Sequence, residues 1–247
     1  MILSFELMLL GIVTTIYLIT LSSIGIKMGL TYFRSKSTVF IYAGISVFGT
    51  ALPWSAPTVY FLSLVFFDDV PPMEVYFLLM GGFLPIASIT WMITILDLFE
   101  VNPTKGKYLK VFFITFWLII EVIYLTLVFT DTTLLGTLED NKIVINLAPF
   151  AQVFLLIALA QMLITTYMLG IYYWRSDRKK IKVQGKIITF ALCLFLIAGL
   201  LEIFIPTIAM NIVARILVMI YAFVYYGGFM MPEWLERLLI KEKRDEN

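Results

Sequence analysis

Seven long runs of predominantly apolar residues divide this sequence, and short polar segments separate them. Each run has about 20 or more residues, and a helix of that length rises about 30 Å, which is the thickness of a bilayer's hydrocarbon core. The runs cover residues 2–29, 38–67, 74–99, 108–130 and 149–174, and two more lie within 186–231. This pattern predicts an all-α integral membrane protein, folded as a seven-transmembrane-helix bundle.

Proline residues stand in the second and third runs and, as Pro206, near the end of the sixth. Pro53 and Pro57 interrupt the second run, and Gly81, Gly82 and Pro85 lie near the start of the third. Proline removes a backbone hydrogen bond from the helix, so kinks are expected at these points. Such kinks free backbone carbonyl groups at membrane depth, where they serve a packing role or contribute to a binding site.

The composition agrees with a membrane protein. Hydrophobic residues make up 61% of the chain and charged residues only 14%, against about 45–50% and about 25% in soluble domains. A chain of this composition has too few polar groups to cover its apolar surface in water. We expect its main partner to be the lipid bilayer, and we expect no binding to nucleic acid.

The charges are segregated between alternate connections. Sixteen of the 18 basic residues fall in one set of connections and in the C-terminal tail. They are Lys27, Arg34, Lys36, Lys105, Lys107, Lys110, Arg175, Arg178, Lys179, Lys180, Lys182, Lys186, Arg237, Lys241, Lys243 and Arg244. Positive residues favour the cytoplasmic side, so the pattern predicts a multi-pass protein of the cell membrane with its N-terminus outside and its C-terminus in the cytoplasm.

Residues 1–231 are predicted to form a single seven-helix domain, and residues 232–247 a cytoplasmic tail at the membrane interface. After Pro232 the tail alternates apolar and charged residues at helical spacing, which predicts a short amphipathic helix with Trp234 and Leu238 toward lipid. On the opposite side, residues 131–147 contain two β-prone segments around residues 139–142 and predict a small hairpin. That hairpin is either a lid over an outward cavity or an ordinary surface loop.

A weak internal repeat relates the two ends of the chain. The segment at 29–35, GLTYFRS, resembles that at 170–176, GIYYWRS, and Pro57-Thr58 matches Pro206-Thr207 after an insertion. A duplication would give a 3+1+3 arrangement, with helices 1–3 and 5–7 as parallel triplets joined by helix 4, as in some transporters. The third and seventh runs do not share the pattern, and chance similarity between membrane sequences is the alternative.

Two full charges stand inside the last two apolar runs, Glu202 in the sixth and Arg215 in the seventh. A charge in hydrocarbon costs at least about 2.5–3.5 kcal/mol, so each is expected to have a partner or a function. If the chain reverses near Ala209, both residues lie roughly 10 Å below the turn and level with each other. We therefore predict that they contact one another. The contact either belongs to a ligand site or only fixes how the two helices pack.

Other polar residues concentrate in the outer half of the predicted bundle. We predict an outward-facing polar pocket whose ligand-binding residues are Glu121, Glu202, Arg215, Asn211, Trp54 and Gln161. Glu121 lies midway along the fourth run without an obvious cation, which favours protonation or ligand contact there.

Several chemistries are excluded by what the sequence lacks. It contains no histidine, which excludes histidine-ligated haem, and it has no spaced metal-binding set, so we expect neither metal nor cofactor. No catalytic motif is present, and we expect no enzymatic activity. The predicted topology resembles that of seven-helix receptors and microbial rhodopsins, but the seventh run has no lysine to hold retinal, only Arg215.

Two functional classes fit these observations best. The first is a receptor-like or sensory protein that binds a small or lipid-like ligand and signals through a cytoplasmic partner or a second copy of the chain. The second is a small-solute transporter in which Glu121 or Glu202 carries a proton. A non-catalytic membrane assembly subunit is the third.

Overall fold

The computed structural model describes residues 4–138, 145–205 and 207–240. Within these residues, seven helical segments are long and apolar enough to cross a membrane. They are Phe5–Ser35, Val39–Phe67, Met73–Leu98, Pro103–Thr130, Pro149–Trp174, Lys179–Phe204 and Ile208–Met230. The predicted seven-helix bundle is therefore confirmed as an arrangement of helices, and its composition is that of a multi-pass membrane protein.

Breaks divide some of these segments into shorter elements. The helices are α1 (Phe5–Leu30), α2 (Tyr32–Ser35), α3 (Val39–Ala51), η1 (Leu52–Trp54), α4 (Ser55–Phe67), α5 (Met73–Gly81), α6 (Leu84–Leu98), α7 (Pro103–Thr130), η2 (Thr132–Leu134), α8 (Pro149–Trp174), α9 (Lys179–Phe204), α10 (Ile208–Met230) and α11 (Glu233–Leu239). The strands are β1 (Gly136–Leu138) and β2 (Ile145–Leu147).

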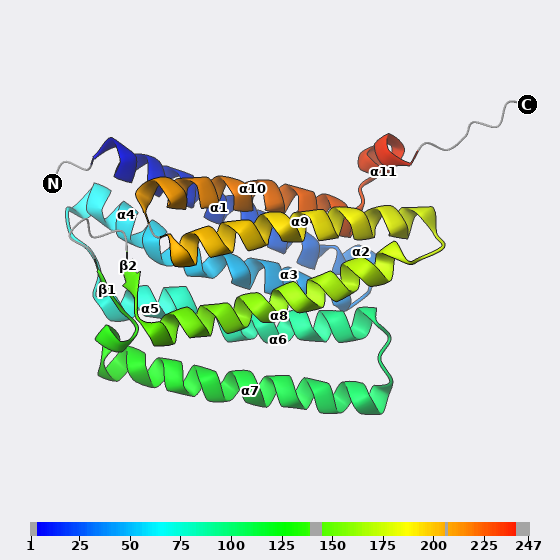
Figure 1. Cartoon of the computed structure of the whole chain (residues 1–247), viewed down its shortest axis with the longest axis horizontal. Coiled ribbons are helices and arrows are strands. Elements are labelled where there is room, and N and C mark those ends of the chain that lie inside the picture. The colour runs from blue at the N-terminus through cyan, green and yellow to red at the C-terminus, as the bar shows by residue number, and fades with distance from the viewer. Residues whose placement is uncertain (1–3, 139–144, 206, 241–247) are drawn as a thin grey trace, which may run out of the picture.

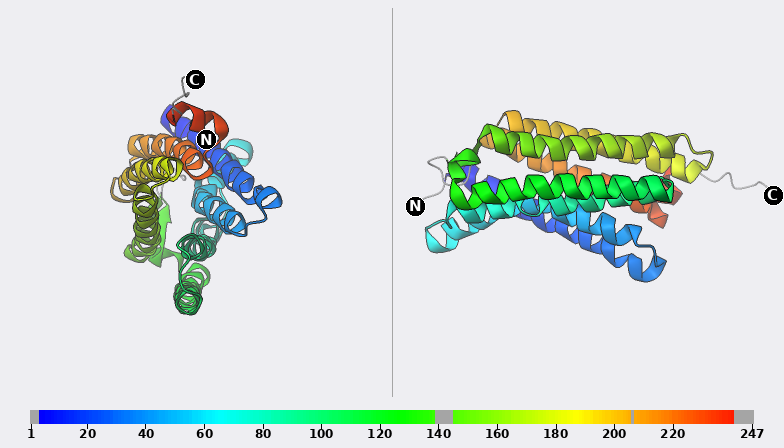
Figure 2. Two further views of the ribbon diagram at one scale, coloured as in Figure 1. Left: turned by 90° about the vertical axis from the view of Figure 1, so that its right-hand side faces the viewer. Right: turned by 90° about the horizontal axis from the view of Figure 1, so that it is seen from below.

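Six of the long helices form a closed ring, in the order α1, α3, α6, α8, α9 and α10 (Figures 1 and 2). The seventh, α7, lies outside this ring and packs against α6 and α5. Its most apolar stretch is only 17% buried in the protein, the lowest value among the seven segments. Most of the surface of this stretch of α7 is thus not covered by the rest of the described protein.

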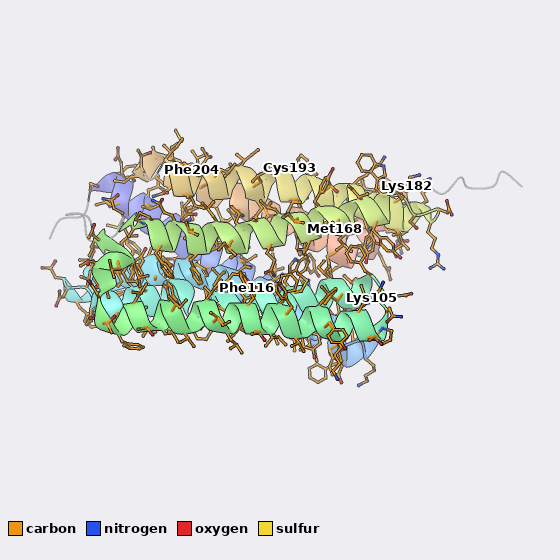
Figure 3. The ribbon with its side chains drawn as sticks, turned by 60° about the horizontal axis from the view of Figure 1, so that its bottom comes forward. Lys105, Phe116, Met168, Lys182, Cys193 and Phe204 are labelled. Atoms are coloured by element: carbon orange, nitrogen blue, oxygen red, sulfur yellow. The ribbon has the colours of Figure 1, made fainter. Side chains whose placement is uncertain are left out.

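The two ends of the bundle differ in the elements that they carry (Figure 1). The N-terminus and the β1–β2 hairpin lie at one end, called here the hairpin end, and α11 lies at the other, called the tail end. Figure 3 shows Lys105 and Lys182 at the tail end and Phe204 at the hairpin end, with apolar side chains such as Phe116 and Met168 between them. The basic connections therefore gather at one end of the bundle.

The predicted helix breaks occur at Pro53 and between Gly81 and Pro85, whereas α4 continues through Pro57 and Pro206 lies outside the described residues. The 3-10 helix η1 holds Pro53 in its first turn and separates α3 from α4. In the third segment, α5 ends at Gly81 and α6 begins at Leu84, with Pro85 in its first turn. Trp54, the last residue of η1, faces the interior of the ring.

Close helix contacts occur at two glycines that the proposed repeat makes equivalent. A β-carbon on Gly44 would lie 2.5 Å from the backbone nitrogen of Gly29, and one on Gly185 would lie 2.7 Å from the carbonyl oxygen of Gly170. Both contacts join the first two helices of a triplet, α1 with α3 and α8 with α9. The ring order is also compatible with a two-fold relation between the triplets. The last helix of each triplet contacts the first helix of the other: α6 contacts α8, and α10 contacts α1.

The predicted hairpin and the predicted tail helix are both present. Strands β1 and β2 pair antiparallel, with Thr137 opposite Asn146. Residues 139–142, around which the hairpin was predicted, lie outside the described residues. Helix α11 follows Pro232 and keeps Trp234 and Leu238 exposed, 67% and 69% respectively, as its amphipathic pattern requires.

Candidate functional site

A cavity of about 180 Å³ lies inside the ring, in the half toward the hairpin end. Its walls come from every ring helix and from α4, α5 and β2. Most of the wall is apolar, including Leu10, Met80 and Leu84. Toward the tail end the cavity stops at Trp91 and Phe195, which belong to a continuous cluster of buried side chains. The cavity is therefore a pocket with a packed floor.

Glu202 and Arg215 contact each other at the edge of this pocket. The Arg215 Nη1 atom lies 2.5 Å from the Glu202 Oε1 atom, so the predicted ion pair is confirmed. The Arg215 side chain is 6% exposed and that of Glu202 is 26% exposed. Nη1 makes no well-aligned hydrogen bond, so the contact is mainly electrostatic.

The two residues are not level, which corrects the sequence prediction. The chain reverses between Phe204 and Ile208 rather than near Ala209, so Glu202 lies about 3 Å from its helix end and Arg215 roughly 10 Å from its own. Side chains on helices point toward the helix N-terminus. On antiparallel neighbours Glu202 therefore points deeper and Arg215 points outward, and the long arginine side chain closes the remaining distance.

Two further residues hold this ion pair in place. The Trp54 indole N–H donates to both carboxylate oxygens of Glu202, at 3.1 and 3.2 Å, and its ring lies 5.3 Å from the Arg215 guanidinium carbon. The Arg215 Nε–H donates to Thr14 Oγ1 at 3.4 Å. Trp54 also packs edge-on against Tyr17. The charges are thus fixed from α1, η1, α9 and α10 together.

Besides Arg215 Nη1, two buried polar atoms of pocket-lining residues have no hydrogen-bond partner among the described residues. They are Asn211 Oδ1 and Ser46 Oγ, on residues that are 8% and 1% exposed and line the pocket. A buried polar group without a partner costs about 1–3 kcal/mol. The Tyr17 and Tyr225 hydroxyls of the packed cluster also lack a partner among the described residues, but the two pocket atoms adjoin a cavity and so offer hydrogen-bonding positions to a ligand or a water molecule.

Gln161 lines the pocket, but its amide already has partners on two other helices. Its Oε1 atom accepts from the Trp117 indole N–H at 2.7 Å, and its Nε2 donates to the Ser88 carbonyl at 2.8 Å. Helix α7 is tied to α8 and α6 through these bonds. The geometry gives Gln161 a structural task in addition to any contact with a ligand.

Glu121 is the one predicted site residue that the structure does not bring to the pocket. It lies on α7, outside the ring, and its Oε2 atom is buried with no hydrogen-bond partner among the described residues. The nearby Tyr124 hydroxyl donates instead to the Phe77 carbonyl at 2.7 Å. The other five predicted residues all line the same pocket: Trp54, Gln161, Glu202, Asn211 and Arg215.

The sequence analysis missed several residues that shape the pocket. On α1, Thr14 accepts from Arg215 and Tyr17 packs against Trp54. The two residues are three apart and so lie on one face of the helix, and this spacing could have identified them from the sequence. Ile145 and Leu147 of β2 line its mouth. The hairpin therefore borders the pocket, as the lid alternative requires.

Taken together, the geometry gives a membrane-type helical bundle whose ring encloses a small, mostly apolar pocket with a fixed ion pair at its edge. In the part of the chain that the structure describes, no group of three or more potential metal ligands occurs. No protein-family description matches the sequence, and a comparison with curated proteins finds no relative.

Proposed function

We propose that this protein is a receptor-like or sensory seven-helix membrane protein that binds a small ligand in the pocket between the ring helices. The observation that carries the proposal is the pocket with an ion pair at its edge and a packed floor. The pocket lies beside β2, and buried side chains fill the interior toward the tail end, which favours binding and signalling over passage.

The pocket also limits the ligand. Its volume of about 180 Å³ is close to that of an engineered cavity of about 150 Å³ that holds benzene, and below the range of about 300–1,000 Å³ for drug-sized sites. Glu202 and Arg215 neutralise each other, and Glu202 is the more exposed partner. We therefore expect a small, largely apolar, uncharged molecule that donates a hydrogen bond to the carboxylate.

Binding of ring-sized probes tests this function. Phenol and indole should bind the purified protein and quench or shift tryptophan fluorescence, because Trp54 lines the pocket. Gly199→Leu should abolish this binding, since Gly199 also lines the pocket and a leucine there would fill it. Tyr108→Leu, on an exposed part of α7, is the control and should leave binding unchanged. Equal responses in the Gly199→Leu variant and the wild type would contradict the proposal.

We also propose that the hairpin end faces outside and the tail end faces the cytoplasm of the cell membrane. The proposal depends on the sixteen basic residues that share one side. In a Cys193→Ser background, Thr137→Cys on β1 should react with a membrane-impermeant maleimide on intact cells, and Lys180→Cys should react only after lysis. The reverse pattern would invert the topology.

A proton-coupled transporter is the second candidate, and two observations favour it. The two glycine contacts fit the repeat expected of a 3+1+3 transporter, and Glu121 has a buried oxygen with no hydrogen-bond partner in the part of the chain that the structure describes. In sealed vesicles a transporter would move the ligand across the membrane, and Glu121→Gln or Glu202→Gln would abolish proton-coupled uptake. A receptor would bind the same ligand without flux.

A further inference from the structure

A second concave site lies on the outside of the bundle at the tail end, separate from the central pocket. It is a groove of about 590 Å³ between the end of α6, the last turns of α8 and the first turn of α9. Its lining residues are mostly aromatic or aliphatic, with one cation, Arg175, and one serine: Phe99, Tyr167, Met168, Ile171, Tyr172, Tyr173, Arg175, Ser176 and Ile181. Figure 3 places Met168 on the outer surface of α8, toward the end where Lys182 lies.

The groove has the length of one membrane leaflet. From Tyr167 to Arg175 the α8 axis rises about 12 Å, close to the roughly 15 Å that half of a hydrocarbon core measures. Its apolar part runs toward the middle of the bundle, where Tyr167 and Met168 are each 53% exposed. Its polar part, Arg175 and Ser176, lies at the helix end, where lipid head groups are found.

The charges around the polar part are strongly positive. The connection 175–186 contains six basic residues and a single acidic one, Asp177. Helix α9 begins here without a side-chain cap and without an acidic residue in its first turn, although the positive end of a helix dipole favours one. Lys180 is paired with Glu236. Within the described residues no ion pair involves Arg175, and none involves Arg178 or Lys182.

We propose that this groove binds one anionic phospholipid of the tail-end leaflet, with an acyl chain along Tyr167, Met168 and Ile171 and its phosphate at Arg175. Charge complementarity selects the lipid class, because an uncharged or zwitterionic head group carries no net negative charge to balance Arg175 and the other basic residues of the connection 175–186. The proposal requires the chain to lie in a bilayer, but it does not depend on a ligand in the central pocket.

Native mass spectrometry of the whole chain in detergent tests the site. With phosphatidylglycerol and phosphatidylcholine added at equal concentration, phosphatidylglycerol should be retained at least fivefold more. Arg175→Gln should lower its retention about fivefold, which corresponds to about 1 kcal/mol for one basic residue near a membrane surface. Arg34→Gln is the matched control, an exposed cation at the same end but outside the groove, and should change retention less than twofold.

The apolar part and the lipid class are tested separately. Ile171→Trp should fill the groove and lower retention of the lipid while the ion-pair residues are unchanged. Equal retention of the two lipids by the wild type would overturn the proposal without the need for any variant. Equal losses from Arg175→Gln and Arg34→Gln would indicate diffuse attraction and overturn it too. Displacement of the lipid by equimolar inorganic phosphate would reveal an anion site without a chain groove, which also contradicts it.

Discussion

Glu202→Gln should lower the stability of the bundle by about 3 kcal/mol, the lower end of the cost of breaking a buried ion pair. The substitution leaves the Arg215 guanidinium 6% exposed with no negative partner, and this group cannot lose its proton. We place the loss at the lower end because Glu202 is 26% exposed and the new amide still accepts hydrogen bonds. Thermal unfolding of the purified protein in detergent measures the change.

Arg215→Gln should cost less than Glu202→Gln. The carboxylate that it leaves behind is more exposed than the Arg215 guanidinium and still accepts from the Trp54 indole. The double variant should recover part of the larger loss, because it leaves no unpaired charge. If the double variant instead loses the sum of both single effects, the two side chains contribute to stability independently. That result would contradict the prediction that their ion pair stabilises the bundle.

Asp97→Asn provides the matched control for this experiment. It removes the carboxylate of the ion pair with Lys110, which lies at the tail end with both side chains about a third exposed. Ion pairs of this exposure contribute about 0–1 kcal/mol, because solvent screens them. The difference in lost stability between Glu202→Gln and Asp97→Asn therefore measures how much burial adds to the stabilising effect of an ion pair.

The sequence predicted the number of membrane-length segments well, because the bilayer fixes their length. Segment ends were predicted less well. The fifth run matches α8 at both ends, but α7 begins at Pro103 instead of 108, where Asn102 caps it by accepting from Thr104 N–H. Likewise α9 begins at Lys179, seven residues before the predicted start. Hydropathy locates the part of a helix in hydrocarbon, whereas backbone hydrogen bonds and caps determine where the helix itself begins.

The contact between Glu202 and Arg215 could be predicted from the sequence, but the location of Glu121 outside the ring could not. The difference has a physical reason. Charges in hydrocarbon need partners, so two of them on adjacent helices strongly constrain the fold. The direction in which an apolar helix faces is much less constrained, since lipid is as apolar as a protein interior. Helix α7 is apolar on nearly every side, and the sequence therefore did not reveal that it lies outside the ring. For the same reason, Thr14 was not predicted as a partner of Arg215.

Gly44→Ala should destabilise the bundle by about 3 kcal/mol, near the upper end of the range for overpacking. The added β-carbon would meet only backbone, 2.5 Å from the Gly29 nitrogen and 2.7 Å from the Gly25 oxygen, so α1 and α3 would have to separate. Thermal unfolding in detergent measures the loss. Gly29→Ala is the control on the other side of the same contact, because its β-carbon would meet nothing within 4 Å. That substitution should be neutral or slightly stabilising, since alanine is the better helix former.

Gly185→Ala extends this experiment to the second triplet. Its β-carbon would lie 2.6 Å from the Trp174 nitrogen and 2.7 Å from the Gly170 oxygen, again against backbone of the preceding helix. If the two triplets pack by the same contact, the losses from Gly44→Ala and Gly185→Ala should agree within about 1 kcal/mol. They should also add in the double variant, because the α1–α3 and α8–α9 contacts share no residue. A Gly185→Ala variant as stable as the wild type would argue that the glycines match by composition alone and that the helix triplets are not equivalent.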